Sequence, residues 1–303
     1  MNVGETELLA ESWQLALRAE RKSPQTLKAY SDGVRFYLAW CADRDVDPLT
    51  RASLNLWVAG LLDGGAAAST ARSRQLAVRR FAAWLAEEGE IPADPFLGVK
   101  SPKLDERVIE PLTDDDLRAL LKACVPPKGA EPKVALRHRR DEAIVRIMLE
   151  TGLRAGEVVG LEVGDVDLAQ GSLIVRRGKG GKGRSVPIGP EASLALDRYL
   201  RLRRSHRLAA GSDLWLGDRG KRFSYDALHK TLRERATAAG IIGFHPHRLR
   251  HTAAHRWLAA GGSESGLMAV AGWTRPDMLM RYTKAQASAR AAEEARKLNL
   301  GEL

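Results

Sequence analysis

Apolar residues recur at helical spacing through the first 90 residues and predict a small bundle of helices. One helix is expected over residues 7–20. A second should open at Ser23-Pro24, because serine is a good N-cap and proline suits the first helical position. A third should begin near Thr50, and a fourth should span residues 69–88.

The fourth of these helices has two contrasting faces. Its apolar side is expected to contain Leu76, Phe81, Trp84 and Leu85, and its opposite side contains Arg72, Arg74, Arg79 and Arg80.

The helical pattern stops between residues 91 and 111, where four prolines occur without an apolar period. We therefore expect a helical domain over residues 1–92, a linker over 93–110 and a second domain over 111–284. The second domain should begin with a helix capped by Thr113 and followed by acidic residues. Short strands over residues 172–177 and 184–188 should form a hairpin around the sequence GKGGKG.

The predicted fold class is mainly α: an N-terminal helical bundle, then a mixed α/β domain that is mostly helical with a small sheet. A chain of 303 residues exceeds the usual single core, which agrees with two domains. There is no run of 18 apolar residues, so no membrane span is expected. The acidic N-terminus does not resemble a secretory signal, and Cys41 and Cys124 have no metal or redox spacing, so the cytoplasm is the expected compartment.

The net charge of +10 lies in the C-terminal two-thirds of the chain. Residues 101–303 hold 36 Lys and Arg against 25 Asp and Glu, whereas residues 1–100 are nearly balanced. This distribution favours a polyanionic partner such as nucleic acid.

Four of the seven histidines lie in the stretch FHPHRLRHTAAHRW, residues 244–257. His247, His251 and His255 share one helical face, which raises the alternative of a metal site. No Asp, Glu or Cys occurs between residues 244 and 262, and three arginines intervene. A metal ion would meet uncompensated positive charge there, whereas arginine is matched to phosphate oxygens. The stretch therefore favours an anion, and no metal or other cofactor is expected.

The glycine-lysine turn does not provide a nucleoside triphosphate site. The spacing G-x-x-x-x-G-K-[ST] cannot be threaded through it, because Arg184 stands where the lysine is required.

Four separated segments carry candidate chemistry: TGLRAGE with Arg154 and Glu157, RRGKGGKGR with Lys179, HPHRLRH with His247 and Arg250, and GWTRPDMLMRYTK with Trp273 and Tyr282. Taken singly, each has a structural explanation, such as a local ion pair or a solvated turn. Their order and spacing together resemble the tyrosine recombinase, or phage integrase, family. The resemblance is strongest over residues 112–284, and the N-terminal bundle is similar to the family's core-DNA-binding domain. The commonest family pattern has His at the position of Trp273, whereas the Cre-like branch, like this chain, has Trp there.

The resemblance implies a site-specific recombinase that cuts and rejoins DNA through a 3′-phosphotyrosyl intermediate. Tyr282 would be the nucleophile, Arg154 and Arg250 would hold the phosphate, His247 would act as base and Lys179 as acid. An indole N–H only donates, so Trp273 would be a phosphate ligand. Glu157 and His251 are expected to support these groups. The DNA contacts are expected to come from Arg72, Arg74, Arg79, Lys182, Arg184 and Arg248.

The expected partners are double-stranded DNA core sites, with a homotetramer on synapsed DNA and a monomer in free solution. Because of the length of the chain, we expect no additional arm-binding domain ahead of the bundle. Accessory DNA-bending factors remain an open alternative. Residues 285–303 should form a tail helix that docks either on its own protomer or on a neighbour. Two other functions remain open: a relaxing enzyme similar to type IB topoisomerases, and a catalytically silent DNA-binding regulator.

Overall fold

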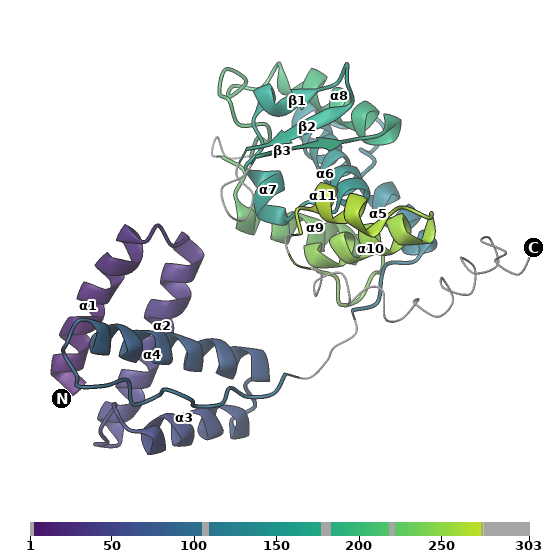
Figure 1. Ribbon diagram of the computed structural model, residues 1–303. Helices are drawn as coiled ribbons and strands as arrows, with labels where there is room; N and C mark the ends of the chain where they lie inside the picture. Colours follow the sequence, from purple (N-terminus) through teal and green to yellow (C-terminus); the bar gives the residue numbers. More distant parts are fainter. Residues whose placement is uncertain (1–2, 105–108, 177–182, 218–221, 274, 276–303) are drawn as a thin grey trace, which may run out of the picture. The chain divides into compact units, whose positions relative to one another are not determined.

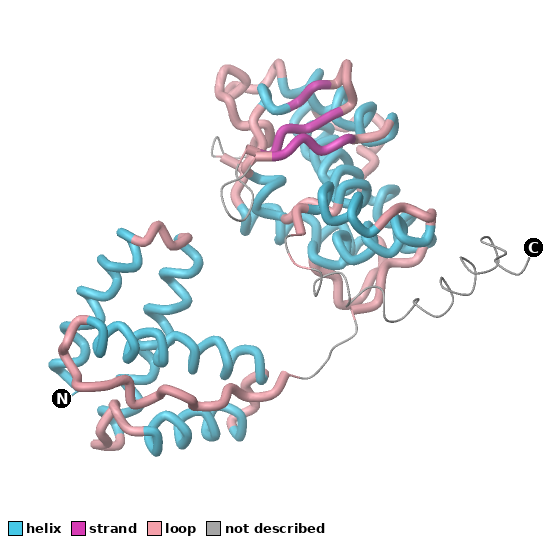
Figure 2. Tube along the Cα trace, in the orientation of Figure 1, coloured by secondary structure: helices cyan, strands magenta, loops and turns pink. Residues whose placement is uncertain are grey.

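The computed structural model describes residues 3–104, 109–176, 183–217, 222–273 and 275. The chain separates into two compact units, Met1–Arg107 and Val108–Leu303. Each unit has its own apolar core, and helices account for most of the described chain (Figure 2). None of the described helices is long and apolar enough to cross a membrane.

In its described residues, 3–104, the first unit is a bundle of four helices (Figure 1). They are α1 (Val3–Ala19), α2 (Pro24–Asp43), α3 (Arg51–Asp63) and α4 (Ala68–Glu87). The expected caps are present: the Ser23 hydroxyl accepts from the Thr26 N–H, and the Thr50 hydroxyl accepts from the Ser53 N–H. Satisfying an unpaired N–H in this way fixes where each helix begins.

Helices α2 and α4 make the principal contact of this bundle, and Gly33 lies where they approach each other. A Cβ on Gly33 would lie 2.6 Å from the Ala77 Cβ, so glycine is required for this separation. The expected apolar face of α4 is wrong at Leu76, which is exposed, whereas Gln75 is buried. The Gln75 amide nitrogen donates to the Lys100 carbonyl at 3.2 Å, which gives this buried polar side chain one hydrogen-bond partner.

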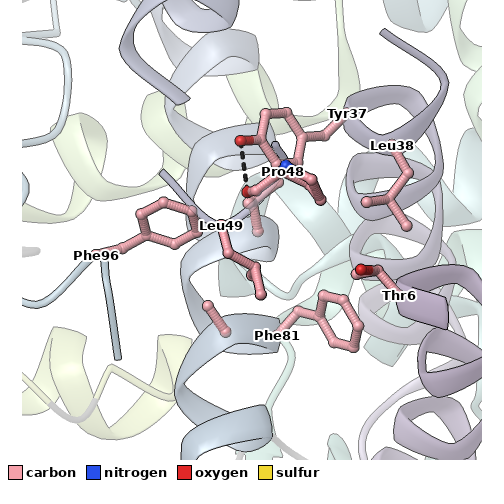
Figure 3. Close-up of a pocket in the computed structure, with 9 residues that line it drawn as sticks. Thr6, Tyr37, Leu38, Pro48, Leu49, Phe81 and Phe96 are labelled. Carbon is pink, nitrogen blue, oxygen red and sulfur yellow. Dashed lines mark hydrogen bonds between the residues drawn. The ribbon is translucent and has the colours of Figure 1, made fainter. Parts of the chain in front are cut away.

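Part of the expected linker packs onto the bundle. Phe96 is fully buried in the first core, and Val99 packs against the same core. Figure 3 shows Phe96 beside a small apolar gap, where the Tyr37 hydroxyl donates to the Pro48 carbonyl at 2.8 Å. The gap measures about 10 Å³, which holds at most one water molecule and excludes a ligand.

The second unit surrounds α6 (Pro132–Thr151), which is buried along most of its length and contacts α8 and α10. The other helices are α5 (Asp114–Ala123), α7 (Ala155–Val159), η1 (Val163–Asp165), α8 (Pro190–Arg203), α9 (Tyr225–Ala238), α10 (Pro246–Ala259) and α11 (Glu264–Ala271). The predicted cap of α5 is confirmed, because Thr113 and Asp116 form a reciprocal capping box.

A small antiparallel sheet lies in the second unit in the order β1-β2-β3 (Figure 1). Its strands are β1 (Val166–Asp167), β2 (Ser172–Val175) and β3 (Arg184–Pro187). The predicted hairpin is confirmed, with Val175 paired to Arg184 at the end next to the connecting loop.

Candidate active site

Arg154 starts from a fixed backbone position at the N-terminus of α7. Helix α6 ends where Gly152 adopts a left-handed conformation with φ of 63°, and two residues later Arg154 is the N-cap of α7. Its backbone N–H donates to Glu157 Oε2 at 2.9 Å. The short turn between the two helices therefore determines where the Arg154 side chain begins.

The Glu157 carboxylate joins two arginines. It accepts from Arg154 at 3.1 Å and from both terminal nitrogens of Arg184, each at 3.0 Å. Burial raises the pKa of Glu157, but the hydrogen bonds and charges of Arg184 and Arg154 outweigh burial and hold this pKa below its usual value. Glu157 is therefore ionised at neutral pH and separates two positive charges.

Three arginines converge on three successive carbonyl groups, those of residues 270–272, immediately before Trp273. Arg154 comes from the turn before α7, Arg184 from β3 and Arg250 from α10. The pairs are Arg184 Nε with the Val270 oxygen at 3.1 Å, Arg250 with the Ala271 oxygen at 2.8 Å, and Arg154 with the Gly272 oxygen at 3.0 Å.

Arg250 is only 1% exposed and also donates to the Gly152 carbonyl, at the turn that leads to Arg154. Its guanidinium carbon lies 5.0 Å from the centre of the Trp273 ring. Trp273 is buried in an apolar cluster between α10 and α11. The two arginines that are expected to hold the phosphate, Arg154 and Arg250, and the tryptophan thus belong to one packed region.

His247 is exposed on the first turn of α10, and its ring lies edge-on to that of His251, with centres 4.8 Å apart. His251 is 8% exposed. Burial, together with the charges of the neighbouring histidines and of Arg250, lowers the pKa of His251 from its ordinary value to about 3. His251 is therefore neutral near pH 7 and adds no charge beside His247. Burial also lowers the pKa of His255, one turn further along α10.

Three sequence-predicted residues, Lys179, Lys182 and Tyr282, lie outside the described residues. Within the described part of the chain, no group of three or more His, Cys, Asp or Glu is arranged to hold a metal ion.

The arginines predicted to contact DNA have different surroundings. Arg72 is exposed on α4, Arg79 is partly exposed there, and the Arg74 guanidinium lies 4.7 Å from the centre of the Phe36 ring. Arg184 is engaged with Glu157 and the Val270 carbonyl. Arg248 donates to the carbonyls of Glu110 at 3.3 Å and Ile242 at 3.0 Å.

Sequence reasoning did not find the carbonyl acceptors of residues 270–272 or the pairing of Arg184 with Glu157. One partial signal exists. Gly272 follows the helical pattern of α11 and adopts a left-handed conformation with φ of 65°, which turns the chain sharply before Trp273.

Both units match known families. Residues 110–289 match the Phage integrase family, and residues 10–89 match the N-terminal SAM-like domain of phage integrases. Tyrosine recombinase XerC of Mycobacterium bovis (strain BCG) is 37% identical over 257 residues, which cover 82% of this chain and 83% of the relative.

Solved structures share the fold. A XerH site-specific recombinase bound to a palindromic difH substrate, in a post-cleavage complex, has a TM-score of 0.72 at 15% identity and covers 97% of this chain and 84% of its own. A lambda integrase dimer bound to a COC′ core site has a TM-score of 0.67 at 16% identity, covering 90% of this chain and 75% of its own. The family matches and the XerC identity together show that this chain belongs to the phage integrase family of tyrosine recombinases.

Proposed function

We propose that this site-specific recombinase cuts and rejoins DNA with Tyr282 as nucleophile, assisted by Arg154, Arg250, Trp273, His247 and Lys179. The observation that carries this assignment is the convergence of Arg154 and Arg250 on the segment that precedes Trp273. Two guanidinium groups from separate elements meet there, and arginine is well matched to the oxygens of a phosphate.

The two arginines would bind the non-bridging oxygens of the scissile phosphate. Charge grows on these oxygens as the nucleophile attacks, and fixed guanidinium groups in a buried site stabilise that charge strongly. Arg250 is suited to this task because its position is set by the carbonyls of Gly152 and Ala271. The Trp273 indole N–H would add a further donor.

Proton transfer would fall to His247 and Lys179. A free tyrosine has a pKa of about 10, so Tyr282 needs a base to lose its proton, and the exposed His247 ring is the candidate. The leaving 5′ oxygen needs a proton, which Lys179 would donate. Nearby cations would depress the pKa of this lysine and help it act as an acid near neutrality.

Attack by Tyr282 would exchange one phosphodiester for another, because the phosphorus–oxygen bond to the 5′ oxygen breaks as the phosphotyrosyl bond forms. The bond energy is retained, so a 5′ hydroxyl can reverse the step and rejoin the strand without an outside energy source. This reversibility is what strand exchange requires.

The DNA partner would be duplex core sites, each bound by two protomers, with four protomers in the synapse and a monomer in free solution. The lambda integrase dimer on its core site supports this arrangement. Accessory DNA-bending factors are compatible with it. Residues 1–92 would bind core DNA, 93–110 would link the domains, 111–284 would hold the catalytic groups, and 285–303 would form the tail.

The experiment that tests the function uses a core site selected by the protein from a random duplex library. A supercoiled plasmid with two direct copies of this site should be resolved into two circles. A plasmid without the site is the control. Relaxation of both plasmids at equal rates without resolution would instead indicate a relaxing enzyme.

A further inference from the structure

Arg184 occupies a junction of the second unit. It is the first residue of β3, and its pairing with Val175 closes the β2–β3 ladder at the end from which the loop with Lys179 departs. Its side chain is only 17% exposed. The Arg184 backbone therefore lies at the base of that loop, and its side chain can connect the loop to other elements of the unit.

The Arg184 side chain forms hydrogen bonds with two other elements, α7 and α11. Both terminal nitrogens of Arg184 bind the Glu157 carboxylate on α7, and Nε binds the Val270 carbonyl at the end of α11. These contacts use the planar fork and the Nε–H together, a set of three directed bonds that the single ammonium of lysine cannot reproduce.

Arg184 also packs directly on Gly272. A Cβ on Gly272 would lie 2.6 Å from the guanidinium carbon of Arg184, which is closer than any side chain allows. The Gly272 carbonyl in turn accepts from Arg154 at 3.0 Å. Arg184 and Arg154 therefore hold the same short segment before Trp273, and they share Glu157 as a common anion.

We infer that Arg184 is a positioning residue for the cleavage reaction, not a DNA contact as the sequence suggested. It holds Glu157 so that Glu157 fixes the Arg154 guanidinium, and it ties the base of the Lys179 loop to the segment that precedes Trp273. The inference rests on the proposed function, because positioning has meaning only if Arg154 and its neighbours act on a phosphate.

Two simpler roles make different predictions. A phosphate contact would contribute to DNA affinity, and its loss would reduce the dependence of log K on log salt by about 0.9. A role in stability alone would lower the melting temperature and leave the cleavage of bound DNA unchanged. A positioning role instead lowers the rate within the bound complex, because small misplacements of reacting groups are costly.

The test compares Arg184→Gln and Arg184→Lys with a matched control, Arg176→Gln. Arg176 flanks the other side of the same loop but pairs with Asp165, away from Glu157. Each variant is bound at saturation to a nicked duplex of the selected core site, and adduct formation per bound complex is timed. DNA affinity is titrated at several salt concentrations, and melting temperatures are recorded alongside.

Arg184→Gln should slow cleavage per bound complex by about tenfold to a hundredfold with an unchanged salt dependence. Arg184→Lys should lie between this variant and the wild type, and Arg176→Gln should cleave at the wild-type rate. The single variant Glu157→Gln is measured as well. The double variant Arg184→Gln/Glu157→Gln should be about as slow as the slower of the two single variants, because both changes break the contact between Arg184 and Glu157.

Cleavage by Arg184→Gln at the wild-type rate per bound complex would overturn the inference, whatever the melting temperature. A reduced salt dependence that accounts for the whole loss would overturn it in favour of a DNA contact. Failure of the proposed function would give a different result, in which the wild-type protein binds the site but forms no adduct. The inference about Arg184 would then fail as well.

Discussion

Single residues of the site differ in how firmly the fold holds them. Arg250 is almost fully buried and bonded to the carbonyls of Gly152 and Ala271, whereas the Arg154 side chain is about one-quarter exposed. In the proposed mechanism both guanidinium groups stabilise charge that develops only during cleavage.

Replacing either Arg154 or Arg250 with alanine should therefore slow cleavage per bound complex by about a hundredfold or more, the usual effect of losing one preorganised donor. Affinity should weaken less, because many other phosphate contacts remain. Timed adduct formation at saturating protein measures this effect, and Arg201→Ala, which removes an exposed helical pair with Asp197, is the control. If affinity collapses while bound complexes cleave normally, both arginines serve only to grip DNA.

His251 makes the stability of the second unit depend on pH. Its pKa is about 3 in the folded chain, because of burial and the neighbouring positive groups, whereas an unfolded histidine titrates near 6.5. Between these values the unfolded chain binds a proton that the folded chain does not, so stability falls as pH drops from about 6.5 toward 3.

The contribution of His251 should reach a slope of up to about 1.4 kcal/mol per pH unit within this window, and His251→Gln should remove it. Urea unfolding of the two proteins at pH 7.5, 6 and 5 measures the difference between their slopes. Parallel pH dependences would show that folding does not lower the pKa of His251 and would contradict this account.

At the scale of elements, helix α10 both contributes residues to the candidate active site and contacts the segment that leads into α5. His247, Arg250 and His251 belong to the candidate active site. Residues 248, 252 and 256 instead hold the segment that leads into α5, through Arg248 with the Glu110 carbonyl, Thr252 with the Leu112 N–H, and Arg256 with Asp114. These three residues, spaced four apart along α10, hold the start of the second unit against the same helix that carries Arg250.

The Thr252 hydroxyl is the buried member of this row. It accepts from the Leu112 N–H at 2.9 Å and donates to the Arg248 carbonyl at 2.8 Å. Thr252→Val keeps the shape but leaves a buried N–H without its acceptor, which should lower the unfolding free energy by about 1–3 kcal/mol. Thr252→Ser keeps the hydroxyl and should lose only about 0.8 kcal/mol, for one methyl group. Chemical unfolding compares them, and equal stability of the valine variant and the wild type would contradict the role.

Helix starts and the hairpin could be predicted from the sequence, because each is determined by residues that are neighbours in the chain. Ser23, Thr50 and Thr113 mark helix starts through their own hydrogen bonds, and the glycine-rich turn between two short strands marks the β2–β3 hairpin. The burial of Gln75 was not predictable, because it depends on a carbonyl 25 residues away.

In the candidate site, too, some residues can be identified from sequence motifs, whereas other contacts depend on residues that are far apart in the chain. Arg154 and Arg250 are identified by their sequence motifs, and the structure brings them to one segment. For Arg184 and Arg248 the sequence alone predicts contacts with DNA. Their acceptors, the carbonyls of Val270, Glu110 and Ile242, become available only when the chain folds.

At the scale of the whole molecule, the proposed mechanism couples assembly on DNA to cleavage. Residues 285–303 lie outside the described residues, and their sequence predicts a helix with apolar positions near its end. A short apolar surface contributes only about 25 cal/mol per Å² buried, so we predict that the tail does not assemble protomers without DNA.

Truncation after residue 284 should therefore leave binding to a half site unchanged and reduce cooperative binding to the full site, together with recombination. Gel-shift titrations on half and full sites measure both quantities. Full-site cooperativity equal to that of the complete chain would show that the tail docks on its own protomer or on nothing.

The central claim is a covalent bond between Tyr282 and DNA. The most direct measurement incubates wild type, Tyr282→Phe and Tyr225→Phe with a labelled, nicked core-site duplex and separates the products on a denaturing gel. Tyr225 is an exposed tyrosine of the same unit and serves as the control. We expect an adduct from wild type and Tyr225→Phe, and none from Tyr282→Phe at unchanged DNA affinity, because only the attacking oxygen is lost. A normal adduct from Tyr282→Phe would contradict the account.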